Sequence, residues 1–240
     1  MLVKYWMSMP ALTVDAQDSL QRAVDLMKEN DVRMLPVLAD GELVGVLTDR
    51  DIQRASPSGL KNLELVEMLS EVSNTLVQEI MSPDPVTARW DSTIEEVALE
   101  LLLRKISGVP VVDDAGAVIG VITVTDIFDM LIALTGYHKK GIQFGLILVD
   151  KPGAIKAVTD LIRDHGARIG SILTTRERAP RGYFRAFIRA YEMDRITGQR
   201  VKEVLNSRMN LLYIIDHDAK VREFYETDHP PTQETDNERI

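Results

Sequence analysis

The sequence predicts an α+β protein in which two pseudo-symmetric repeats form one module and a βαββαβ domain follows. The first observation is an internal repeat, because residues 7–52 and 81–127 follow one pattern. The second is the order of strand and helix patterns in residues 141–217. We therefore expect four segments: repeat one at 1–60, a linker helix and repeat two at 61–136, a third domain at 137–225, and a disordered tail at 226–240.

The composition is that of a globular protein, since 45% of the 240 residues are hydrophobic and 27% are charged. No apolar run approaches the ~20 residues that span a bilayer, and the first residues lack the apolar stretch of a signal peptide. The chain contains no Cys, which excludes disulfides and thiol catalysis. We expect a cytoplasmic protein with no membrane partner.

The net charge of −9 is distributed unevenly along the chain. Residues 1–136 carry 10 Lys and Arg against 22 Asp and Glu, whereas residues 137–240 carry 18 against 15. An acidic first half argues against a nucleic-acid groove and disfavours a triphosphate ligand there. The basic excess of the second half is dispersed without a Lys/Arg run, so we expect no nucleic-acid partner.

In each repeat a short strand leads to an amphipathic helix and then to a β-hairpin. The helix is indicated by apolar residues at i, i+3, i+4 and i+7. These are Leu20, Ala23, Val24 and Met27 in the first copy and Ile94, Val97, Ala98 and Leu101 in the second. We place the helix starts at capping boxes that begin with Asp18 and Ser92. The hairpins turn at 39–41 and 113–116, where Asp and Gly separate β-branched runs.

Two connectors separate these units. Between the repeats the sequence predicts a loop at 55–59 and an amphipathic helix that carries Leu63, Val66 and Leu69. The second connector, residues 135–141, contains Gly and Lys and is a plausible domain boundary.

The third domain begins with a strand at 142–149, which is apolar on both faces and is therefore predicted to be central. A helix follows the turn at 150–153 and ends at Gly166. The remaining elements are strands at 168–175 and 183–191, a helix at 195–206 and a strand at 211–215. This order is that of the ferredoxin-like split βαβ pattern. The polar tail carries a Pro pair and is predicted to be disordered.

Each repeat ends in Thr-x-x-Asp at a strand-to-helix turn, with Thr48 and Asp51 in the first copy and Thr123 and Asp126 in the second. Free backbone N–H groups at such a turn attract phosphate, and the Thr hydroxyl and Arg50 would add hydrogen bonds. The two oxygens of an Asp carboxylate suit a pair of ribose hydroxyls. The same residues are common N-caps, so a purely structural role stays open.

The two turns are not equivalent in charge. Thr125 occupies the place that Arg50 has in the first copy. A guanidinium can hold a phosphate through two parallel hydrogen bonds, which a hydroxyl cannot do. We expect the Thr123/Asp126 cleft to bind a phosphorylated ligand more weakly, to be empty, or to hold a less charged molecule.

The repeated unit resembles a CBS domain, and the pair resembles a CBS tandem, or Bateman module. The resemblance rests on the Pro36 and Pro110 strands, the Asp- and Gly-containing turns, and Gly-h-h-Thr-x-x-Asp after each of them. It implies two clefts that bind adenine ligands of the AMP, ATP, NAD or S-adenosylmethionine class, and a regulatory role. It also places the adenine beside the residues that precede the prolines, which are Met34, Leu35, Gly108 and Val109.

Residues 144–155, FGLILVDKPGAI, resemble the first strand and turn of an ACT domain. That resemblance implies pairing of the domains through their sheets, and an amino-acid-like effector near Asp150, Gly153, Ala154 and Ile155. The alternative is that Pro152 and Gly153 only begin a helix. A CBS tandem followed by an ACT unit, with the opening MLVKYWMS, resembles the acetoin-utilisation protein B type. This implies a link to acetoin or carbon-source metabolism.

We find no catalytic and no metal-binding pattern. No Ser/His/Asp set, paired carboxylates or phosphate-binding Gly loop is readable, and the four His show no ligand spacing. Three hypotheses follow: a non-enzymatic nucleotide sensor with no catalytic cofactor, an enzyme whose catalytic residues are hidden in the clefts, and an assembly module without ligand. We expect a homodimer or larger assembly, because the strands of the third domain are apolar on both faces. The regulated protein is not encoded in any motif.

Overall fold

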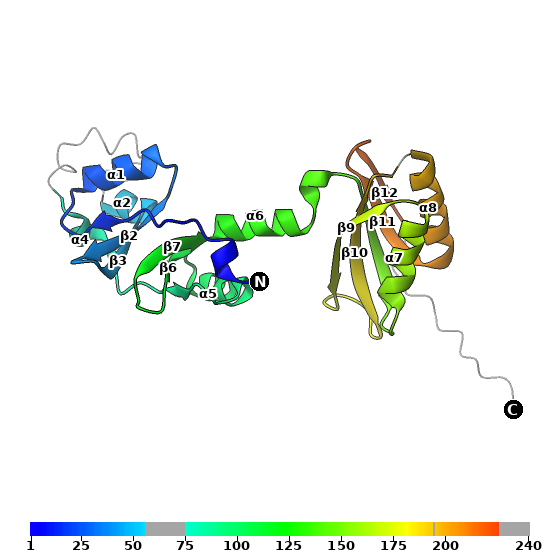
Figure 1. Ribbon diagram of the computed structural model, residues 1–240, viewed down its shortest axis with the longest axis horizontal. Helices are drawn as coiled ribbons and strands as arrows, with labels where there is room; N and C mark the ends of the chain where they lie inside the picture. The colour runs from blue at the N-terminus through cyan, green and yellow to red at the C-terminus, as the bar shows by residue number, and fades with distance from the viewer. Residues whose placement is uncertain (56–74, 194, 226–240) are drawn as a thin grey trace, which may run out of the picture. The chain divides into compact units, whose positions relative to one another are not determined.

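The computed structural model describes residues 1–55, 75–193 and 195–225. It divides into two compact units, Met1–Met130 and Leu131–Ile240 (Figure 1). The first unit contains both repeats. The predicted linker helix and tail lie outside the described residues, as does most of the predicted loop at 55–59.

In the first unit, each repeat folds into a small sheet with helices. The first repeat comprises η1 (Val3–Tyr5), β1 (Val14–Asp15), α1 (Leu20–Glu29), β2 (Met34–Ala39), β3 (Glu42–Thr48) and α2 (Asp49–Ala55). The second comprises α4 (Val77–Ile80), β4 (Ser82–Pro83), β5 (Ala88–Arg89), α5 (Ile94–Arg104), β6 (Gly108–Val112), β7 (Val118–Thr123) and α6 (Val124–Leu134). The sheet orders are β1-β2-β3-β4 and β5-β6-β7, so the predicted hairpins are β2/β3 and β6/β7.

The helices α1 and α5 start one residue later than predicted. Their N-caps are Ser19 and Thr93, whose side chains accept hydrogen bonds from backbone N–H groups at 3.3 Å, and Glu96 completes a capping box with Thr93. The predicted capping boxes at Asp18 and Ser92 are therefore wrong by one position. Asp18 instead accepts a hydrogen bond from the N–H of Asp15 and closes the preceding turn. Most residues of the two predicted apolar stripes are buried in the cores of the repeats, which confirms the prediction for them.

The opening segment of each repeat docks on the hairpin of the other repeat. Ser82 pairs with Val46 in β3, and Ser8 pairs with Val121 in β7. The hydroxyls of these serines donate to Asp51 and Asp126 respectively, both at 3.3 Å. The repeats are thus joined reciprocally, each by the Met-Ser pair that begins it.

Gly45 and Gly120 allow this close approach. A Cβ on Gly45 would lie 2.6 Å from Met81 Sδ and 3.0 Å from the backbone oxygen of Ser82. A Cβ on Gly120 would lie 2.9 Å from the backbone oxygen of Ser8. These distances are too short for a methyl group, and backbone oxygens cannot swing away as a side chain can.

Gly45→Ala and Gly120→Ala are each expected to lower the free energy of unfolding by about 1–3 kcal/mol, because the added methyl overpacks the junction between the repeats. Urea denaturation of the purified variants would measure this. Unchanged midpoints for both variants would show that the junction can widen at no cost.

The second unit is a single antiparallel sheet with two helices. Its elements are η3 (Tyr137–Lys139), β8 (Ile142–Val149), α7 (Ala154–Asp164), β9 (Arg168–Thr175), β10 (Tyr183–Tyr191), α8 (Arg195–Arg208), β11 (Asn210–Asp216) and β12 (Val221–Phe224). The strand order is β12-β11-β8-β10-β9, so β8 is internal as predicted. The sequence missed β12, which is only four residues long and has two adjacent charged residues at its centre instead of an alternating pattern.

The core of the second unit lies between the sheet and the helices, which cover one face of the sheet (Figure 1). Phe144, Leu146 and Ile188 from the sheet are fully buried there with Val158 and Leu205 from the helices. Gly166 follows the end of α7 with a φ of 81°, which confirms its predicted place. No helix in the described part of the chain is long and apolar enough to cross a membrane.

Candidate functional site

The first Thr-x-x-Asp turn joins β3 to α2 and is built around a buried carboxylate. Asp51 is only 3% exposed. Its Oδ2 accepts from the backbone N–H of Thr48 at 2.9 Å and from the Thr48 hydroxyl at 2.5 Å. Its Oδ1 accepts from the Ser82 hydroxyl at 3.3 Å and from the guanidinium of Arg54. The motif therefore has the structural role that the sequence left open, because Asp51 forms all these hydrogen bonds with other groups of the protein.

The second turn repeats this geometry with one difference. Asp126 Oδ2 accepts from the backbone N–H of Thr123 at 2.7 Å and from its hydroxyl at 2.6 Å. The alignment that places Thr125 opposite Arg50 places Asp129 opposite Arg54. A carboxylate thus stands where the first repeat has a second cation, and the expected charge difference between the turns is larger than Arg50 alone predicts.

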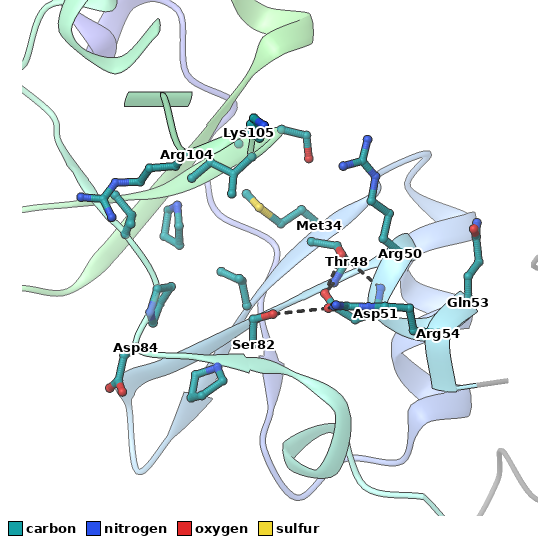
Figure 2. Close-up of a pocket in the computed structure, with 18 residues that line it drawn as sticks. Met34, Thr48, Arg50, Asp51, Gln53, Arg54, Ser82, Asp84, Arg104 and Lys105 are labelled. Carbon is teal, nitrogen blue, oxygen red and sulfur yellow. Dashed lines mark hydrogen bonds and ion pairs between the residues drawn. The ribbon is translucent and has the colours of Figure 1, made fainter. Parts of the chain in front are cut away.

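A cavity of about 980 Å³ opens beside the first turn (Figure 2). Five of the predicted site residues line it: Met34, Thr48, Arg50, Asp51 and Gly108. Thr123 and Asp126 of the second turn are not part of this lining. The cavity lies within the first unit and receives side chains from both repeats.

Leu35 and Val109, which were also predicted to contact the ligand, are not among the lining residues. They are 0% and 2% exposed and pack in the cores of their own repeats. Neighbouring residues on a strand point to opposite faces, so Met34 and Gly108 reach the cavity while the next residue turns inward. Pro110 returns to the cavity side.

Several lining residues were missed by sequence reasoning. Arg54 comes from α2, Ser82 from β4, and Arg104 and Lys105 from the end of α5. Figure 2 shows Arg104 and Lys105 across the cavity from the side chains of α2. Four cationic side chains therefore line the cavity against the two carboxylates of Asp51 and Asp84. The acidic total charge of this half does not describe its cavity, because the cations are concentrated there.

The sequence did contain one signal for these cations. The repeat alignment matches Arg104 with Asn30 and Lys105 with Asp31, so the two copies differ in charge at the end of the helix as well. What could not be read is that α5 of the second repeat faces the turn of the first. That placement depends on how the repeats pack on each other.

Comparison with known proteins assigns the first unit. The CBS domain model matches residues 3–58 and 77–133. A CBS domain-containing protein of Dictyostelium discoideum is 33% identical over 132 residues, which are 55% of this chain and 91% of that protein. This chain belongs to the CBS domain family. Two further curated relatives are enzymes, an L-aspartate semialdehyde sulfurtransferase and an inosine-5'-monophosphate dehydrogenase, of which the chain spans 22% and 21%.

Solved structures of CBS proteins are similar over the same part of the chain. The CBS domain pair of protein MJ0100, solved with 5′-methylthioadenosine and S-adenosyl-L-methionine, is 32% identical and aligns over 55% of this chain and 99% of that one, with a TM-score of 0.45. A candidate acetoin utilization protein from Vibrio cholerae is 24% identical, with 59% and 97% covered and a TM-score of 0.48.

The family match ends at residue 133, before the sheet of the second unit. In that unit, a cavity of about 270 Å³ is lined by all four predicted effector residues, Asp150, Gly153, Ala154 and Ile155. Asp150 is already bound by Arg176, which donates to its two oxygens at 2.7 and 2.9 Å. These hydrogen bonds lower the pKa of Asp150 below its ordinary value. Within the described residues, no cluster of three His, Asp or Glu side chains is placed to hold a metal.

Proposed function

We propose that the CBS pair is a non-catalytic sensor that binds an adenine nucleotide in the 980 Å³ cavity. The observation that carries this proposal is Arg50, an exposed cation at the rim of the first turn. In the described part of the chain its guanidinium has neither a hydrogen bond nor an ion pair. A free guanidinium beside a polar turn and an apolar cavity wall suits a ligand that combines a phosphate with an aromatic base.

The lining divides into parts that fit such a ligand. Met34, Val46 and Pro110 offer apolar contacts for the base. Asp51 Oδ1 would accept hydrogen bonds from ribose hydroxyls. Its present donors are the Ser82 hydroxyl, at the long distance of 3.3 Å, and the guanidinium of Arg54, whose side chain is 74% exposed. A ligand can displace both donors. Arg50 would hold the phosphate. AMP, ATP, NAD and S-adenosylmethionine are the ligands of this class to titrate.

Arg50→Ala is expected to weaken AMP binding by about tenfold and adenosine binding much less, because a charge-assisted hydrogen bond to phosphate is lost. The difference should shrink in high salt, which screens the exposed pair. Isothermal calorimetry would measure both ligands. Arg181→Ala, a change at an exposed arginine of the second unit, controls for net charge. Equal weakening of AMP and adenosine would show that Arg50 is structural.

An assembly module without ligand is the second candidate, and one observation favours it. Helix α5 exposes Leu99, Leu102 and Leu103 by 54%, 74% and 68%. Such a stripe is typical of a surface that another protein covers. A nucleotide that binds the native state must raise the melting temperature. A nucleotide panel that produces no thermal shift would therefore favour assembly over sensing.

For the second unit we propose an ACT-like domain that relays or integrates the nucleotide signal. Support comes from the βαββαβ order, with β12 added at the edge, and from the small cavity at the predicted effector turn. The homodimer and the link to acetoin metabolism stay predictions.

A further inference from the structure

The cavity of the CBS pair receives cations from both repeats. Arg50 and Arg54 lie on α2 of the first repeat, and Arg104 and Lys105 lie at the end of α5 in the second. Lys105 is the C-cap of α5, with a left-handed φ of 57°. Its side chain thus leaves the helix where the chain changes direction.

Two of these four cations already have counter-charges. Arg54 is paired with Asp51, and Arg104 donates to Glu100 at 2.6 Å. Among the described residues, neither Arg50 nor Lys105 has a hydrogen-bonding or ionic side-chain partner. Two uncompensated positive charges from opposite repeats therefore border one cavity (Figure 2).

This arrangement is not a consequence of the repeat itself. At the matching places the other copy has Thr125 for Arg50 and Asp31 for Lys105. Of the two pseudo-equivalent sets of positions, one carries the cations and the other does not. The cations also lie in a half of the chain whose total charge is negative. Like charges at a shared cavity raise the free energy of the protein unless a ligand neutralises them.

We propose that this cavity selects an adenine nucleotide with two or more phosphoryl groups, and that Lys105 is the residue that selects it. The inference rests on the proposed nucleotide site. Arg50 would bind the phosphate next to the ribose, and Lys105 would bind the terminal phosphate from across the cavity. A single phosphate bound by Arg50 would leave Lys105 without a phosphoryl group to bind. The volume of about 980 Å³ lies near the upper end of small-ligand sites and leaves room for the longer chain.

Calorimetric titration of AMP, ADP and ATP without divalent metal tests the proposal. The wild type should bind ADP and ATP at least about tenfold tighter than AMP. Lys105→Gln should remove that gain and change AMP affinity by less than about twofold, because glutamine keeps a polar side chain only one atom shorter but removes the charge. Lys105→Arg should retain the preference.

Lys220→Gln is a matched control, since Lys220 is an exposed lysine with a φ of 56° and lies in the second unit. It should leave all three affinities unchanged. If AMP binds and ADP binds no tighter, or if Lys105→Gln weakens all three ligands equally, the selectivity is overturned while the nucleotide site stands. If none of the three binds, both proposals are overturned.

Discussion

Asp51→Ala is expected to lower the free energy of unfolding of the CBS pair by about 3 kcal/mol and to abolish nucleotide binding in the cavity. The carboxylate is 3% exposed and accepts from Thr48, Ser82 and Arg54. Its removal leaves the Thr48 N–H and the Ser82 hydroxyl without their acceptor, and each unsatisfied buried group costs about 1–3 kcal/mol. The Ser82 bond also joins the repeats, so the cavity walls lose a link.

The second repeat supplies a matched control for this change. Asp126 makes the same two bonds to Thr123 and the same link to the other repeat through Ser8. Unlike Asp51, it has no arginine partner among the residues that the structure describes, and it lies outside the cavity lining. Asp126→Ala should also destabilise the protein but should leave binding in the cavity intact. Urea denaturation and calorimetry separate the two effects. An Asp51→Ala protein that binds nucleotide with wild-type affinity would contradict the assignment of Asp51 to the site.

Arg189→Met is expected to lower the free energy of unfolding of the second unit by about 3 kcal/mol. Arg189 lies in β10, is 3% exposed, and donates to the carbonyl oxygens of Thr135 at 2.7 Å and Lys140 at 2.9 Å, and to Gln143 at 3.2 Å. Burial lowers the pKa of its guanidinium, but no carboxylate offsets the charge in these contacts. The hydrogen bonds to the carbonyls therefore hold it, and methionine cannot replace them.

Arg185 is the control, because it lies on the same face of β10 four residues earlier. Its Nε is buried without a hydrogen bond in the described structure. Replacing an unsatisfied buried polar group with an apolar one is close to neutral or stabilising, so Arg185→Met should not destabilise the protein. Hydrogen exchange gives a second measurement, since Arg189→Met should speed exchange across residues 135–140. Equal stability of both variants would show that the segment is held by other contacts.

Much of the fold follows from local patterns. The repeat, the hairpin turns and the internal position of β8 could be predicted because each depends on residues close together in the sequence. The predicted helix start at Asp18 was one residue early, since Asp18 and Ser19 are both good caps and only the first hydrogen-bonded turn distinguishes them. Strand β12 was missed because a short charged segment pairs only when a neighbouring strand is present.

The sequence by itself determined the two Thr-x-x-Asp turns and the charge difference at Arg50, since side chains three residues apart meet at a helix start whatever the rest of the chain does. The tertiary structure decided which residues surround them. Packing of the repeats brings Ser82 to Asp51 and Lys105 to the cavity of the first repeat, and the alternation of side chains along β2 turns Leu35 into the core. Such contacts join residues far apart in the chain, and their free energy exists only once both repeats are folded and docked.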